Sequence, residues 1–257
     1  AGALPKWPGN LKQYQLGKTG TNITLRDSLG AAAINGNTGF ITNCAVSHWT
    51  SGQDDGYWSF SPSDDEISCD DSENDNWQDG PNVEKGGQAY VLRATSGRTM
   101  KTCSSTHTSC TSLDDFGTLN GDVTAVLTTE TINWALGTNV DNVGSKGATV
   151  KRPYVHGDVI HSRPVALNYG SDIAPQVVVY YGANDGALRA INGNQVGGAN
   201  IASKGPGTEI WSFMPPEFWG ELDRLRTNTD TVKFPATGPA AGASGSLKAY
   251  GMDGIIT

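Results

Sequence analysis

The amino-acid sequence predicts a mainly β fold with long loop insertions and a few short helices. Glycine supplies 33 of the 257 residues, which indicates many tight turns. Few segments carry a sustained apolar repeat of 3.6 residues, so a coiled coil and a helical bundle are excluded. Short runs rich in β-branched and aromatic residues recur in the second half, each bounded by Gly, Asn or Asp. A chain of this length can form one all-β domain.

The composition of the chain argues against a nucleic-acid partner and against a membrane-spanning segment. Lys and Arg together number 18 and Asp and Glu 26, which gives a net charge of −8. Binding to a nucleic-acid backbone needs grouped Lys and Arg, and the sequence has no such cluster, so we expect no nucleic-acid partner. No apolar run approaches the ~20 residues that cross a bilayer, so we expect no membrane span.

The first half of the chain predicts few strands. We expect one strand within residues 9–16 and another at 22–25, joined by a turn at 17–20. Residues 64–79 are acidic and poor in aliphatic side chains. This composition predicts an extended insertion rather than part of the core.

Two short helices are expected in the same half. Residues 83–93 predict the first, although two internal glycines lower its helix propensity. Residues 129–136 predict the second more clearly, because Thr128 can cap its start and Gly137 can end it in a left-handed conformation.

The second half is more regular. Four short antiparallel strands within about fifty residues make one unit of the size of a propeller blade. They are expected at residues 163–168, 176–181, 187–192 and 209–213, with a tight turn at 182–186. A helix follows Pro215-Pro216, with Phe218, Leu222 and Leu225 on one face. Residues 227–246 are expected to form a surface loop, and 247–250 and 254–257 to begin a next blade.

The cysteines indicate an oxidising compartment. Cys44, Cys69, Cys103 and Cys110 allow three pairings if all are oxidised. Cys103 and Cys110 bracket a short polar stretch suited to a disulfide loop, in which case Cys44 and Cys69 would pair. A metal site that uses His48 or His107 is the alternative, but no Cys-x-x-Cys pair supports it. Disulfides predict a location in the periplasm or at the cell surface.

The acidic insertion is the strongest electrostatic feature. Its carboxylates are Asp64, Asp65, Glu66, Asp70, Asp71, Glu73, Asp75 and Asp79. Asp71, Glu73 and Asp75 have the alternating spacing of hard oxygen ligands that suits Ca²⁺, although the expected glycine and the bidentate Glu are missing. A solvated acidic loop is the simpler interpretation, and weak Ca²⁺ binding is the alternative hypothesis.

Other polar and aromatic residues offer no catalytic group. His156 and His161 lie five residues apart on a predicted strand, with Asp158 between them, so hydrogen bonding at a strand end is favoured over metal binding. The sequence has no nucleophile elbow, no phosphate-binding loop and no dinucleotide-binding glycine motif. Three tryptophans in loop-like sequence, Trp49, Trp58 and Trp77, are candidates for a contact surface, with burial beneath the insertion as the alternative.

Several segments together carry a resemblance to a known family. They are HGDVIHSRP at 156–164, VVVYYGANDGALRA at 177–190, EIWSFMPPE at 209–217, WQDGPNVEKGG at 77–87 and GNLKQY at 9–14. In these segments the chain resembles the PilC/PilY family of type IV pilus biogenesis factors and tip-associated adhesins of Gram-negative bacteria.

This resemblance implies a modified β-propeller, similar to quinoprotein propellers, at the C-terminal end of a larger secreted protein. It implies roles in pilus assembly, in opposing retraction and in surface attachment. The implied partners are minor pilins and host or abiotic surfaces, and the implied location is the periplasm, the outer membrane surface or the pilus tip. The calcium-binding loop of the family has no clear counterpart here, so calcium control is not carried over to any residue.

The chain has room for one recognisable blade, so it resembles a piece of that domain. Residues 1–150 then form a lead-in region with strands, the acidic insertion and short helices. Residues 151–257 form the blade, the following helix and the start of the next blade. No signal peptide precedes Ala1 and the chain stops in a strand-like apolar run, so we expect a chain that is cut from a longer protein.

Three hypotheses about function remain open. The first is a non-enzymatic, pilus-associated protein whose surface loops bind partners. The second is a quinone-dependent dehydrogenase, which needs a cofactor platform, a metal and a carboxylate base that the sequence does not assemble. The third is a generic secreted β-domain that binds glycans or proteins.

Overall fold

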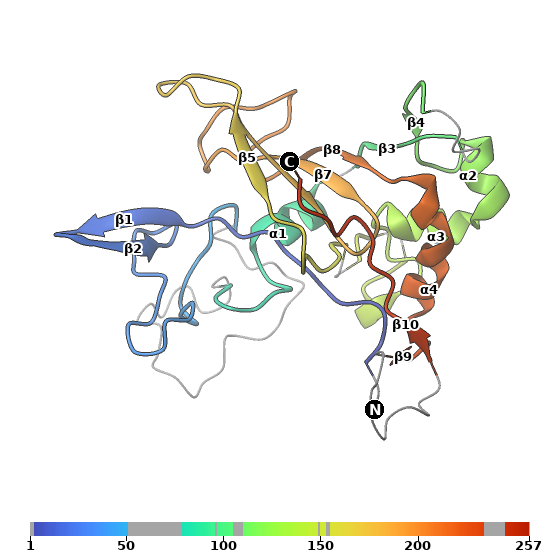
Figure 1. Cartoon of the computed structure of the whole chain (residues 1–257), viewed down its shortest axis with the longest axis horizontal. Helices are drawn as coiled ribbons and strands as arrows, with labels where there is room; N and C mark the ends of the chain where they lie inside the picture. The colour runs from blue at the N-terminus through green and yellow to red at the C-terminus, as the bar shows by residue number, and fades with distance from the viewer. Residues whose placement is uncertain are drawn as a thin grey trace.

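The largest element of the computed structural model is one mixed sheet of six strands (Figure 1). The structure describes residues 3–50, 79–95, 97–104, 110–148, 150–152, 155–233 and 245–256. Within them, two further two-stranded sheets and several short helices accompany the six-stranded sheet, and no closed barrel forms. The expectation of a mainly β fold with a few short helices is confirmed at this level, and the propeller stays a prediction.

Four consecutive strands form an antiparallel meander at one side of this sheet. They are β5 (Val165–Asn168), β6 (Val177–Gly182), β7 (Leu188–Asn192) and β8 (Glu209–Phe213), each bonded to the next. All four lie within two residues of their predicted positions. The two central strands, β6 and β7, are mostly buried; β6 is a nearly continuous apolar run, whereas β7 also buries the polar side chains of Arg189 and Asn192.

The sheet continues into the first half of the chain. Strand β3 (Met100–Thr102) pairs in parallel with β8, and β4 (Asp114–Asp115) pairs antiparallel with β3 at the edge. Neither strand was expected, because two or three residues are too few to show an alternating pattern. Strands from both sides of residue 150 therefore share one sheet.

Several short helices accompany the sheet. They are α1 (Gly87–Ala94), α2 (Gly121–Val126), α3 (Thr129–Ala135), the 3₁₀ turn η1 (Val143–Ser145), the 3₁₀ turn η2 (Pro216–Glu221) and α4 (Leu222–Thr227). The predicted capping of α3 is confirmed, since Thr128 accepts from Thr131 N–H and Gly137 has a φ of 99°. Helix α2, capped by Asn120, was not expected.

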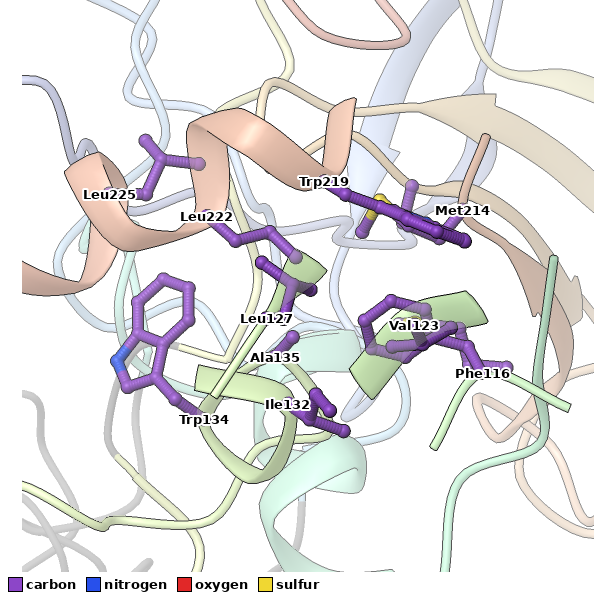
Figure 2. Packing of buried hydrophobic residues seen from close by; sticks show 12 residues of the cluster. Phe116, Val123, Leu127, Ile132, Trp134, Ala135, Met214, Trp219, Leu222 and Leu225 are labelled. Atoms are coloured by element: carbon purple, nitrogen blue, oxygen red, sulfur yellow. The ribbon is translucent and has the colours of Figure 1, made fainter. Parts of the chain in front are cut away.

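The main hydrophobic core lies between the sheet and the helices α2, α3, η2 and α4 (Figure 2). Trp219 of η2 and Leu222 of α4 face Leu127 and Ile132, which lie at the end of α2 and within α3. The remaining buried members are Met100, Phe116, Val123, Trp134, Ala135, Ala187, Met214 and Leu225. This core thus combines residues from both of the predicted regions, 1–150 and 151–257.

A two-stranded hairpin projects from the body at the left of Figure 1. Strand β1 (Gln15–Thr19) pairs antiparallel with β2 (Asn22–Arg26), and Gly20 (φ 62°) lies in the turn. The first strand begins later than predicted, because earlier residues form isolated bridges to distant parts of the chain, such as Gln13 with His48. It also runs through residues 17–19, which were expected to form the turn.

The C-terminal segment returns to the meander. After the short parallel pair β9 (Val232–Lys233) and β10 (Ser246–Leu247), Met252 N–H donates to the carbonyl of Ala183. Gly182 allows this approach, because a Cβ there would lie 1.9 Å from the Met252 carbonyl oxygen. None of the helices in the described ranges has the length and apolar character needed to cross a membrane.

Candidate functional site

Two of the motif segments are joined by a buried chain of ion pairs. Arg98 donates from Nε and Nη2 to the two oxygens of Glu209, at 3.0 and 2.9 Å. Arg189 lies with its Nε 3.4 Å from Glu209 and donates from Nη1 to Asp185 at 3.0 Å. All these side chains are largely buried. This series of ion pairs therefore links the β6–β7 turn, β7 and β8 to the residues that precede β3.

The neighbouring arginines keep the carboxyl groups of Asp185 and Glu209 ionised. Burial alone would raise the pKa of Asp185, but the charge of Arg189 outweighs it and holds that pKa well below its ordinary value. Burial opposes ionisation of Glu209 in the same way, and Arg98 lowers the pKa of that group. Both carboxylates therefore act as fixed counter-charges for the two buried guanidinium groups.

His156 lies in the same interior and is held neutral. Its Nε2 is 2.7 Å from the hydroxyl of Tyr181, and its Nδ1 is 2.6 Å from the carbonyl oxygen of Gly157. Burial, with the charge of Arg189 as the second cause, lowers the pKa of His156 to about 3. The side chain is thus a hydrogen-bonded interior group at the end of its segment.

His161 occupies a different environment from His156. Its backbone N–H donates to Asp253 at 3.1 Å and its Nδ1 contacts the other oxygen of that carboxylate. More than half of the His161 side chain is exposed. Asp158, the residue between the two histidines, contacts neither; it accepts from Asn184 and Lys248.

The described residues contain no group of three or more His, Cys, Asp or Glu side chains that could hold a metal ion. The calcium hypothesis concerns Asp71, Glu73 and Asp75, which lie outside the described residues, as do Asp64, Asp65, Glu66 and Asp70. Asp79, at the end of the acidic stretch, is fully buried, with Lys12 Nζ at 3.0 Å, and accepts from Ser47. That carboxylate belongs to the interior and not to a solvated loop.

The cysteines show one complete pair. Cys103 and Cys110 form a disulfide that closes the loop between β3 and β4. Cys44 is also disulfide-bonded, and its predicted partner, Cys69, lies outside the described residues, as does His107. In the described residues no cysteine is free.

Of the three tryptophans proposed for contact, Trp49 belongs to the interior. It is 4% exposed, and its indole N–H donates to the carbonyl of Asn194 at 2.7 Å. Its φ of 71° is rare for a bulky residue, so surrounding contacts must hold it in place. Trp58 and Trp77 lie outside the described residues.

The β1–β2 hairpin instead presents an exposed apolar face. The register places Leu16 opposite Leu25 and Ile23 opposite Lys18, so all four side chains lie on one face. Leu16 and Ile23 are 73% and 74% exposed. The alternation of apolar and polar residues within the two strands is the sequence signal for this surface.

The hairpin is also basic in an acidic chain. Between residues 10 and 26 the sequence contains Lys12, Lys18 and Arg26 and no carboxylate, whereas the whole chain carries −8. Lys12 is paired with Asp79 inside the body, and Arg26 donates to the carbonyl of Gly30 at 2.8 Å, so the cation on the apolar face of the hairpin is Lys18.

Comparisons of the chain with protein families, with curated proteins and with solved structures give no match.

Proposed function

We propose that the chain is part of a PilC/PilY-type pilus factor, without enzymatic activity, that supports pilus assembly and surface attachment at the outer surface of a Gram-negative bacterium. The observation that supports this most is the packing of the motif segments. Segments 156–164, 177–190 and 209–217 adjoin or build one antiparallel meander, and buried polar contacts tie them together. These segments form one structural unit, as is expected of segments that together carry the sequence pattern of one family.

Within this proposal the β1–β2 hairpin is the contact surface for a pilus component. An isolated two-stranded hairpin is at best marginally stable in water, so a projecting one with an uncovered apolar face gains stability from a partner. Lys18, which shares this face, selects a partner surface that is apolar at its centre and acidic at its rim. A minor pilin with such a surface is the proposed occupant.

A capture experiment tests the contact. The immobilised wild-type chain is expected to retain minor pilins, and the double variant Leu16→Thr, Ile23→Thr to lose most of this binding. Threonine keeps the β-branched shape suited to strands and removes apolar contact area. Ile173→Thr is the matched control, because Ile173 is 96% exposed in the loop between β5 and β6.

Equal retention by the wild type and the double variant would place the contact elsewhere. Failure of the wild type to retain any pilus component would contradict the proposed function itself. Binding to a glycan array with no dependence on pili would favour the generic β-domain, and a quinone absorbance band in the purified protein would favour the dehydrogenase.

A further inference from the structure

A lysine, a carboxylate and an amide meet in the interior where the C-terminal segment crosses the β6–β7 turn. Lys248 Nζ donates to Asp158 Oδ1 at 3.3 Å, and Asn184 Nδ2 donates to Asp158 Oδ2 at 2.6 Å. One carboxylate therefore holds both the amine and the amide nitrogen. The three residues are 7%, 8% and 4% exposed.

We propose that Lys248 and Asn184 form an intramolecular isopeptide bond, with Asp158 as the group that transfers the proton. This chemistry needs an amine nucleophile, an acyl carbon with a leaving group, and an acid–base group that contacts both nitrogens. Asp158 has the required position, since its two oxygens contact the nitrogen that attacks and the nitrogen that leaves.

A backbone contact activates the amide. Gly251 N–H donates to Asn184 Oδ1 at 3.1 Å, so the carbonyl oxygen of the amide is polarised before reaction. A fixed donor at that oxygen also stabilises the negative charge that develops there when the carbonyl carbon is attacked. Gly251 follows Lys248 by three residues, so the same short segment carries both the nucleophile and this donor.

The surroundings restrict water. The ring of Trp7 lies 4.1 Å from Lys248 Nζ, and the ring of Tyr250 lies 6.0 Å away. Lys248 Nζ also donates to the Pro5 carbonyl at 3.3 Å. The adjoining cavity, lined in part by Trp7, Asp158 and Asn184, has a volume of about 10 Å³. That is room for about one water molecule, so hydrolysis of the amide competes weakly with attack by the amine.

The reaction balances without an oxidant or a co-reactant. Asp158 accepts a proton from the Lys248 ammonium group, and the neutral Nζ attacks Cγ of Asn184. The Nζ–Cγ bond forms and the Cγ–Nδ2 bond breaks, while Asp158 passes the proton to Nδ2. The second proton that Nζ loses on acylation leaves with the ammonia, as ammonium. The chain loses one ammonia, about 17 Da.

The bond would tie the C-terminal segment covalently to the β6–β7 turn. It would close residues 184–248 into one loop, and it is independent of the proposed function.

A second buried pair of a lysine and a carboxylate serves for comparison. Lys12 also meets a buried carboxylate, Asp79, but its other hydrogen bonds go to backbone carbonyls, and among the described residues no side-chain amide bonds to Asp79.

Mass spectrometry of the purified chain tests the proposal. After reduction of the disulfides and unfolding, the intact mass is expected about 17 Da below that of the sequence. A tryptic digest is expected to contain a branched peptide that joins the Asn184 peptide to the Lys248 peptide. The chain should remain uncut after Lys248 and be cut normally after Lys12, which serves as the internal control.

Variants assign the roles. Lys248→Arg and Asn184→Ala are expected to have the full mass, and Asp158→Asn to have mostly the full mass because the proton carrier is lost. Lys12→Arg is expected to keep the ammonia loss. Circular dichroism establishes which variants fold, and the wild-type mass decides the question without them.

Three results would overturn the proposal. The first is a wild-type chain of full mass. The second is an ammonia loss with normal cleavage after Lys248, which indicates a succinimide at Asn184 instead of a cross-link. The third is a loss of about 18 Da, which indicates water loss and a bond from Lys248 to Asp158.

Discussion

Glu209 illustrates how single residues hold this interior together. It accepts two hydrogen bonds from Arg98 and lies against Arg189, so its removal would leave two guanidinium groups buried without their shared counter-charge. Breaking a buried ion pair by removing one partner costs far more than the pair contributes as a whole.

We therefore expect Glu209→Gln to lower the free energy of unfolding by about 3–5 kcal/mol, measured by urea unfolding. Asp230→Asn is the control, because Asp230 pairs with Arg224 at 2.9 Å at a partly exposed site. Its expected effect is below about 1 kcal/mol. Equal effects of the two variants would show that the buried chain of ion pairs does not stabilise the fold.

His156 should make stability depend on pH. Its pKa is about 3 in the folded protein and near the ordinary 6.5 when unfolded, so the folded state binds the proton less well. Its stabilising effect is complete above pH 6.5 and is lost as the pH falls towards 3. The slope reaches about 1.4 kcal/mol per pH unit.

Unfolding curves between pH 7 and pH 5 measure this slope. His156→Gln is expected to flatten it, because the variant has no imidazole to protonate in the unfolded state. A slope that persists in His156→Gln would assign the pH dependence to another group.

At the scale of elements, local signals account for what the sequence predicts well. The meander β5–β8 and helix α3 follow from neighbouring residues: β-branched runs, an Asn-Asp-Gly turn and a Thr cap. Strand β3 was missed because its three residues acquire strand geometry only by pairing with β8, far along the chain. The residues around β3 therefore give no indication that it pairs with β8.

The candidate site likewise combines features that the local sequence shows with contacts that only the fold shows. The segments that carry the resemblance are continuous stretches of sequence, but the contacts of Asp158 with Lys248 and of Lys12 with Asp79 join distant residues and appear only in the fold. For Trp49 the loop-like sequence left a contact surface and burial both open, and burial is correct, because its partner, Asn194, lies in the second half of the chain.

The cap of α3 gives a quantitative test at this scale. Thr128→Ala removes the side-chain acceptor for Thr131 N–H and is expected to destabilise the protein by about 1 kcal/mol. Thr129→Ala, one position along, is the control, with an expected change within about 0.5 kcal/mol. Thermal unfolding of the two variants compares them directly. Indistinguishable midpoints would mean that the cap does not contribute.

At the scale of the whole molecule, the six-stranded sheet and its core form the body, and the hairpin projects from it (Figure 1). Stability and contact are thus assigned to different parts. A substitution on the hairpin should alter binding without changing the unfolding free energy of the body. A substitution in the buried ion chain should do the reverse.

The most direct test of the proposed function is complementation of a strain that lacks the gene for the full-length protein. Surface pili are counted and attachment is measured after expression of the wild type, of Leu16→Thr with Ile23→Thr, or of Ile173→Thr. At equal protein levels, the wild type and Ile173→Thr are expected to restore pili and attachment, and the double variant is not. Normal pili in the deletion strain would contradict the proposed function, and full restoration by the double variant would contradict the role of the hairpin.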